Sequence, residues 1–204
     1  MNSELYLALK PDQIFHNKIR ALFSALPKGS FILPVEDSGT GKSKRRLGPH
    51  ISIVDAEYND PGDPHFKRLM LKIAGLIAPR HSILLRPIIG TKNNELLLVP
   101  YRDQIKVLRE FRNRAIDCLG LEIIGRLDPH LSLFSLNPKF DYSELANAIS
   151  SIRIRFNVDT IYTARTNSSN PRKVSIDTFR PRLQRGRFET SPYLMQSQEH
   201  TPLN

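Results

Sequence analysis

A heptapeptide that occurs twice constrains the fold of this chain more than any other feature. The copies are Arg46-Leu47-Gly48-Pro49-His50-Ile51-Ser52 and Arg126-Leu127-Asp128-Pro129-His130-Leu131-Ser132. Each copy continues into apolar residues, so each is typical of a β-strand that enters a core. Side chains alternate between the two faces of a strand, so the His and the Ser of each copy share one face while the apolar residues take the other. The repeat therefore predicts two strands that each present an imidazole and a hydroxyl away from the core.

The duplication extends to a second pair of segments. Residues 4–14 align with residues 95–105, and six of the eleven positions are identical. The offset is 91 there (95 − 4) and 80 at the histidines (130 − 50), so the first half carries 11 more residues (91 − 80). We place these extra residues in a polar, glycine-containing basic loop at 36–46.

Hydrophobic periodicity predicts alternating strands and helices in two similar sets. The predicted strands lie at 4–9, 31–33, 82–89, 95–99, 158–165 and 173–179, with two more carrying His50 and His130. The predicted helices lie at about 12–26, from 63 or 64 onward, from 103 onward and at 142–152. This order predicts an α+β fold with two pseudo-symmetric lobes in one domain, residues 1–182, whose second half starts near 82–95. A polar and basic tail at 183–204 is predicted to be disordered.

Composition narrows the class of protein. Thirty Lys and Arg against twenty Asp and Glu give a formal charge of +10, which attracts polyanions such as nucleic acid. A single cysteine, Cys118, excludes an internal disulfide and a thiolate metal cluster. The sequence lacks an apolar run long enough for a membrane span and lacks a secretory signal, so we expect an intracellular, cytoplasmic protein, or a nuclear one if the source is eukaryotic.

Two histidines in matched settings suggest an acid and a base. Histidine titrates near neutral pH, so a neutral imidazole can take a proton from an attacking oxygen while a protonated one donates to the leaving oxygen. Hydroxyls at Ser52 and Ser132 would then bind the non-bridging oxygens of a phosphoryl group. This chemistry predicts His50 and His130 as catalytic residues, with neither metal nor cofactor.

The paired motifs resemble the 2H phosphoesterase superfamily, which includes bacterial RNA 2′,3′-cyclic phosphodiesterases (the "2′-5′ RNA ligase" family) and eukaryotic cyclic phosphodiesterases. The likeness covers about residues 3–180. It implies a bilobal α+β fold in which two antiparallel sheets face a central cleft, with helices outside and the two histidines opposed across the cleft. It also implies hydrolysis of 2′,3′-cyclic phosphate ends of RNA or nucleotides by a protein that we expect to be a monomer. Many cyclic phosphodiesterases have Thr where this chain has Ser52 and Ser132.

Several alternatives stay open. Arg46 and Arg126, four residues before their histidines, either contact phosphate or are solvated at a strand entrance. Tyr6 and Tyr162 either stack on a base or pack in the core. The other enzymatic readings are a 3′-5′ RNA exonuclease that uses the neighbouring 2′-hydroxyl, and a phosphodiesterase of 2′-5′-linked or cyclic oligonucleotide signals. The non-enzymatic reading is an RNA-binding module.

Overall fold

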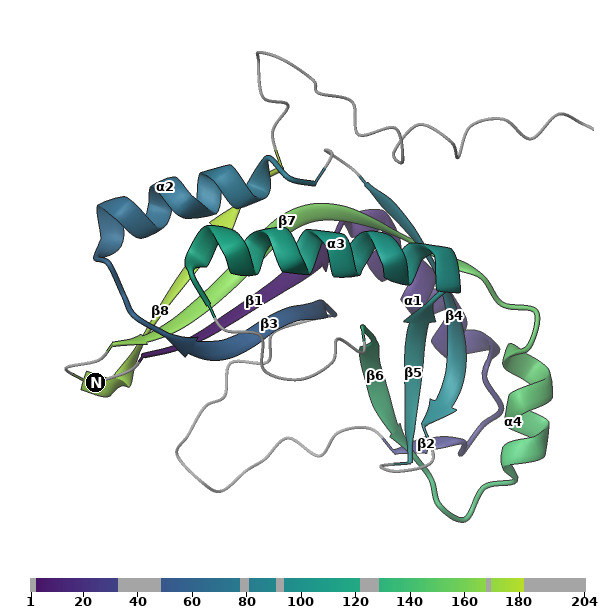
Figure 1. The fold of residues 1–204 in the computed structure, drawn as a ribbon. Coiled ribbons are helices and arrows are strands. Elements are labelled where there is room, and N and C mark those ends of the chain that lie inside the picture. Colours follow the sequence, from purple (N-terminus) through teal and green to yellow (C-terminus); the bar gives the residue numbers. More distant parts are fainter. Residues whose placement is uncertain are drawn as a thin grey trace, which may run out of the picture.

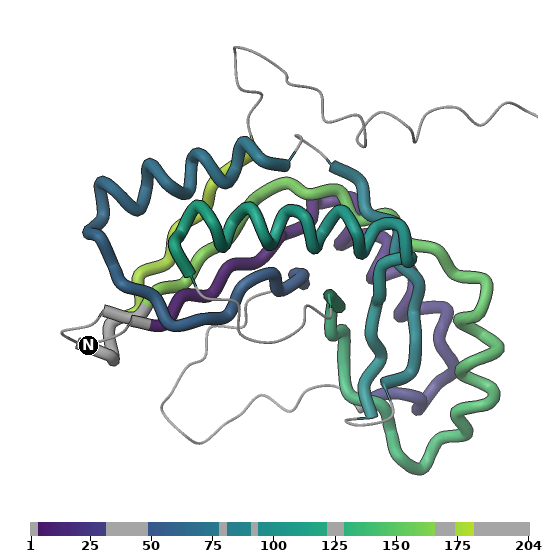
Figure 2. Tube along the Cα trace, viewed as in Figure 1, coloured from purple at the N-terminus to yellow at the C-terminus, as the bar shows by residue number. Residues whose placement is uncertain are grey.

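The computed structural model describes residues 3–32, 49–77, 81–90, 94–121, 129–167 and 170–181. The predicted basic loop at 36–46, Arg46, Arg126 and the predicted tail at 183–204 lie outside these residues. Within the described part the chain forms four helices and eight strands, and the predicted α+β fold is confirmed (Figures 1 and 2). The strands are β1 (Ser3–Pro11), β2 (Phe31–Ile32), β3 (Ile51–Tyr58), β4 (Ser82–Gly90), β5 (Glu95–Pro100), β6 (Leu131–Leu136), β7 (Ile154–Asn167) and β8 (Asn170–Phe179). The helices are α1 (Gln13–Ala25), α2 (Asp63–Ala74), α3 (Arg102–Leu119) and α4 (Tyr142–Ile149).

All strand pairs are antiparallel, and β7 joins them into two wings. The order along the sheet is β2-β6-β5-β4-β7-β1-β3, with β8 pairing with the far part of β7. The first residues of β7, Ile154–Asn157, pair with β4, whereas Val158 and the residues after it pair with β1. One long strand therefore runs through both wings, which diverge from it in Figure 1.

Each wing is built from both halves of the sequence. We count the second half from β5, which is the counterpart of β1. The first wing, which contains β1 and β3, then takes β7 and β8 from the second half. The second wing, which contains β5 and β6, takes β2 and β4 from the first half. The helices α1 and α3 also pack against the wing that contains the motif strand of the other half. The aromatic ring of Phe15 in α1 packs on Phe156 and that of Phe23 packs on Phe134, both in the second wing, while α3 packs against β3. The two halves are thus interleaved, and neither wing consists of one half alone.

The point where β7 passes from one wing to the other is fixed by hydrogen bonds. Asp12 caps the N-terminus of α1 by accepting from the backbone N–H of Phe15 at 3.0 Å. Its other carboxylate oxygen accepts from the Asn157 amide at 2.8 Å. The next residue, Val158, donates its backbone N–H to the carbonyl of His81 at 2.8 Å. The capping residue of α1 and the residue just before β4 therefore both fix the place where β7 stops pairing with β4 and begins to pair with β1.

The core lies between the helices and one face of the sheet. On β1 the alternate residues Leu5, Leu7 and Leu9 are fully buried, as the period of two requires. Phe66, Met70 and Ile73 of α2 and Leu108, Phe111 and Ala115 of α3 are buried at helical spacing. The opposite face of β1, which carries Tyr6, Ala8 and Lys10, points away from the layer of Leu5, Leu7 and Leu9.

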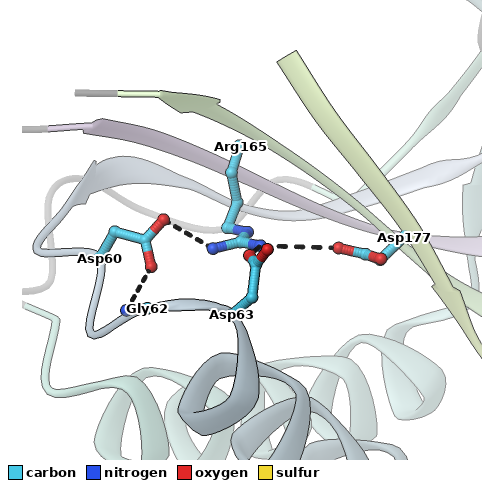
Figure 3. A network of polar contacts seen from close by, with 5 residues as sticks. All are labelled: Asp60, Gly62, Asp63, Arg165 and Asp177. Atoms are coloured by element: carbon cyan, nitrogen blue, oxygen red, sulfur yellow. Dashed lines mark hydrogen bonds and ion pairs between the residues drawn. The ribbon is translucent and has the colours of Figure 1, made fainter. Parts of the chain in front are cut away.

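A buried cation stabilises the helix-facing side of the first wing (Figure 3). Arg165 is 2% exposed and pairs in the sheet with Leu5, so its guanidinium lies on the core face. It donates to Asp60 at 2.6 Å and to Asp63, the first residue of α2, and Asp177 on β8 lies 3.7 Å away. The guanidinium also lies 3.8 Å from the centre of the Phe66 ring. Charge-assisted bonds and a cation–π contact together compensate a charge that would be costly to bury alone.

Candidate active site

The structure gives both motif histidines the same local position. His50 immediately precedes β3 and His130 immediately precedes β6, so each imidazole stands at the entrance of a strand. His50 is half-buried and His130 is exposed, and Ser52 and Ser132 follow the same order. In the view of Figure 1, β3 and β6 both begin in the centre of the molecule, between the two wings.

The strand pairing of the two motifs is equivalent residue by residue. Ser52 pairs with Ala8 and Ile51 with Leu9, while Ser132 pairs with Leu97 and Leu131 with Leu98. In both pairs the register then shifts by one residue, so that the residue after the serine is left out of the ladder. These residues, Ile53 and Leu133, form a β-bulge at the same place in each half.

The register corrects the offset expected between β1 and β5. Leu9 of β1 and Leu98 of β5 hold the same position opposite their motif strands, so the structural offset is 89 (98 − 9), and the alignment by sequence identity, with an offset of 91, was wrong by two residues. Six identities, three in the strand and three at the helix start, had favoured the other alignment. At the structural offset, the residue equivalent to Tyr6 is Glu95 (6 + 89). Their cross-strand partners agree, because Tyr6 pairs with Asp55 and Glu95 pairs with Ser135.

In the first motif, the Tyr6 hydroxyl connects the histidine to the serine. The phenol oxygen lies 2.6 Å from His50 Nε2 and 2.5 Å from Ser52 Oγ. The two rings are 5.8 Å apart between centroids and meet edge to face at 87°. Burial raises the pKa of the Tyr6 phenol, the hydrogen bond with Ser52 lowers it, and the nearby Asp55 and Tyr162 raise it further. The balance is upward, so this phenol keeps its proton across the neutral range.

In the second motif, the equivalent residue also contacts the serine, but it is an acid. Ser132 Oγ donates to Glu95 Oε2 at 3.3 Å. Glu95 and Tyr6 thus make the same contact, each with the motif serine of its own strand pair. Glu95 was missed from the sequence because the identity-based alignment set it against Glu4. The offset between the two strand registers, which comes from the structure, pairs it with Tyr6 instead.

The remaining predicted site residues differ in whether the structure places them at a motif. Tyr162 pairs with Ala8 and lies on the Tyr6 face, but it is only 4% exposed, and the Lys10 ammonium lies 4.6 Å from its ring centre. This leaves little ring surface for a nucleobase. For Tyr6 the sequence left base stacking or core packing open, and the structure places its hydroxyl beside His50 and Ser52. Arg46 and Arg126 lie outside the described residues.

The described residues contain neither a metal-binding cluster nor a membrane-spanning helix. No three His, Cys, Asp or Glu side chains there gather closely enough to bind a metal ion. No helix in these ranges is both long and apolar enough to cross a membrane.

Comparison with solved structures identifies the fold. No family model and no curated protein sequence matches the chain. The structure of TT0787 from Thermus thermophilus matches 90% of this chain and 100% of its own, with a TM-score of 0.50 at 12% identity. Escherichia coli LigT in complex with 3′-AMP matches 88% of this chain and 96% of its own (TM-score 0.47, 12% identity), and a structure described as a phosphoesterase matches 87% and 96% (TM-score 0.44, 13% identity). At these identities the likeness shows the fold alone.

Proposed function

We propose that this protein is a metal-independent phosphodiesterase that hydrolyses 2′,3′-cyclic phosphate ends of RNA or nucleotides. The observation that carries the proposal is the matched setting of the two motifs, His50 with Ser52 and His130 with Ser132. Each pair has the same strand position, the same cross-strand register and the same bulge. A repeat kept only for packing has no need to present an imidazole and a hydroxyl on the face away from the core.

The proposed reaction divides proton transfer between the two histidines. Water attacks phosphorus as one imidazole takes a proton from the water, and the other imidazole gives a proton to the departing ribose oxygen. Ser52 and Ser132 contact the non-bridging phosphoryl oxygens, on which negative charge gathers in the transition state. The formal charge of +10 attracts an anionic substrate, and Lys10 adds a cation on the Tyr6 face of β1. The choice of a cyclic phosphate as substrate follows from the family resemblance of the motifs.

The test is turnover of a mononucleoside 2′,3′-cyclic phosphate in excess chelator. We expect activity under these conditions and a loss of about 10²- to 10⁴-fold in kcat for His50→Ala and for His130→Ala. His65→Ala is the matched control, because His65 is an exposed residue of α2, away from both motifs. Turnover that vanishes on chelation would contradict the metal-free mechanism, and full activity in either motif variant would contradict the assigned roles.

The same assay separates the neighbouring functions. An RNA exonuclease that uses the 2′-hydroxyl as nucleophile would stop at a 2′-deoxyribose placed before the scissile bond. Hydrolysis of a 2′,3′-cyclic phosphate needs only the cyclic end of the substrate. A pure RNA-binding module would retain RNA and turn over neither substrate.

A further inference from the structure

The hydrogen bond between Tyr6 and His50 limits what the first motif can do directly. An imidazole Nε2 carries one lone pair or one hydrogen in the plane of the ring, so it has a single hydrogen-bonding position. At 2.6 Å, the phenol oxygen of Tyr6 takes that position. While this contact persists, a proton that enters or leaves Nε2 must pass through the Tyr6 hydroxyl.

The phenol is held from both sides, and its single hydrogen couples the two contacts. If Ser52 donates to Tyr6, the phenol hydrogen points at His50 Nε2, which is then neutral there and able to accept it. If His50 donates from Nε2, the phenol hydrogen points at Ser52. The network therefore has two directions, and moving one proton through Tyr6 converts one into the other.

The second motif differs at this position. Its equivalent residue, Glu95, accepts from Ser132 and has no hydroxyl to pass a proton on. The two halves share a backbone register but offer different chemistry beside the serine. A hydroxyl bridge between the histidine and the serine is a property of the Tyr6 side.

We propose that Tyr6 is a catalytic residue of the first motif and that its hydroxyl carries the proton between His50 and the substrate oxygen. This inference rests on the proposed phosphodiesterase function and deepens it. When His50 serves as the base, the attacking water forms its bond to phosphorus and loses a proton to Tyr6 Oη as the original phenol proton moves to His50 Nε2. His50 gains one proton, Tyr6 ends unchanged, and the P–O bond to the ribose breaks with its electron pair, protonated from His130. When His50 serves as the acid, the same transfers run in reverse, from Nε2 to Oη and from Oη to the leaving oxygen.

Tyr6→Phe removes the hydroxyl and keeps the ring. We expect kcat for a 2′,3′-cyclic phosphate to fall about 10²-fold or more, with KM within about threefold. The double variant Tyr6→Phe/His50→Ala should be no slower than the slower single variant, because both residues act in one transfer. Tyr58→Phe is the matched control: this buried tyrosine of β3 has a hydroxyl without a hydrogen-bond partner among the described residues, so its loss should change kcat less than twofold.

Two results would overturn the relay. If Tyr6→Phe keeps or raises kcat, the phenol leaves Nε2 when substrate binds, and His50 acts directly. If the losses in the double variant multiply, the two residues have separate roles. Wild-type turnover that His130→Ala abolishes supports the phosphodiesterase function independently of Tyr6, whereas an inactive wild-type protein would overturn both proposals.

A fluorinated tyrosine at position 6 keeps the hydroxyl and the fold, so it tests the relay even if the phenylalanine variant is poorly folded. Its more acidic phenol should move the alkaline limb of the kcat profile to lower pH. A tyrosine that only supports its neighbours would leave that limb in place, and an unshifted limb would therefore contradict proton transfer through Tyr6.

Discussion

Replacing Arg165 by Met should destabilise the protein strongly and leave the candidate site intact. The guanidinium is 2% exposed and makes two short charge-assisted hydrogen bonds, to Asp60 and Asp63, besides the ion pair with Asp177. Met keeps a long, unbranched apolar side chain at this position but removes the guanidinium, with its charge and its contact with the Phe66 ring. The side chain lies on the helix-facing side of the sheet, opposite the face of Tyr6.

The size of the effect follows from how exposed each partner is. Removing one member of a buried ion pair costs about 3–5 kcal/mol when the other stays buried. Here Asp60 and Asp177 are 25% and 27% exposed and Asp63 is 67% exposed, so water restores part of their solvation. We therefore expect a loss of about 2–3 kcal/mol, or about 4–12 °C in Tm for a chain of this size. Asp63→Asn removes only the most exposed partner and should cost about 0.5 kcal/mol.

The assay is urea unfolding followed by circular dichroism, with kcat measured on the same samples below the transition. Arg165→Met should lower the unfolding free energy severalfold more than Asp63→Asn, and both variants should keep wild-type kcat. Equal losses in the two variants, or a change below about 1 kcal/mol for Arg165→Met, would show that the buried cation is not what stabilises this side of the wing.

Three further outcomes follow from single side chains. Burial lowers the pKa of His81 from 6.5, so the unfolded chain binds this proton at a higher pH than the folded chain does. The free energy of unfolding should therefore fall as the pH drops below about 6.5. In calorimetry between pH 7 and pH 5, His81→Gln should show a smaller decrease in Tm than the wild-type protein. Thr163 is fully buried, and its hydroxyl has no hydrogen-bond partner among the described residues. In urea titrations, Thr163→Val should leave the unfolding free energy unchanged or raise it by up to about 1 kcal/mol. A clear loss of unfolding free energy would show that the hydroxyl has a hydrogen-bond partner. The Glu95 carboxylate accepts the hydrogen bond of the Ser132 hydroxyl and repels anions. Glu95→Gln should therefore lower the inhibition constant of inorganic phosphate about 3- to 10-fold. A higher inhibition constant would show that the carboxylate helps to bind the phosphate.

The strands and helices were predictable where their periodicity is strong. The helical spacing of apolar residues located α2 and α3 correctly, because the buried face of a helix recurs at that spacing. The helix predicted at 142–152 ends at Ile149, and the strand predicted at 173–179 begins at Asn170. Such ends depend on capping and on pairing with neighbours, which local periodicity does not contain.

The exchange between halves was not predictable from the repeat. β2 follows α1 in the chain yet pairs with β6 of the second half, and Phe31 reaches Leu136 across that pair. A duplicated sequence predicts two similar sets of elements but does not say whether each set closes on itself. The interleaving depends on the long-range pairing of β2 with β6 and of β7 with β1.

The candidate site was half visible in the sequence. The motif histidines and serines were identified by spacing, because alternation along a strand puts them on one face. The roles of Tyr6 and Glu95 depend on which residue of β1 or β5 lies diagonal to the motif serine, and that register is set by the bulges at Ile53 and Leu133. A slip of two residues keeps the same face of the strand but changes the partner, so identity alone could not choose between them.

The two motifs have the same backbone pairing but different side chains beside the serine. This difference can explain how a duplicated site performs an asymmetric reaction. In the proposed hydrolysis, one histidine must begin neutral and the other protonated, whereas a duplication begins by giving both the same surroundings. The strand pairing and the bulge have stayed alike, since they aim the imidazole and the hydroxyl. The residue beside the serine differs, with a phenol at Tyr6 and a carboxylate at Glu95. Exchanging these two side chains, Tyr6→Glu with Glu95→Tyr, should therefore disturb proton transfer far more than folding. Its readout is the pH profile of kcat set against an unchanged Tm, and a wild-type profile in the exchanged protein would show that the asymmetry arises elsewhere.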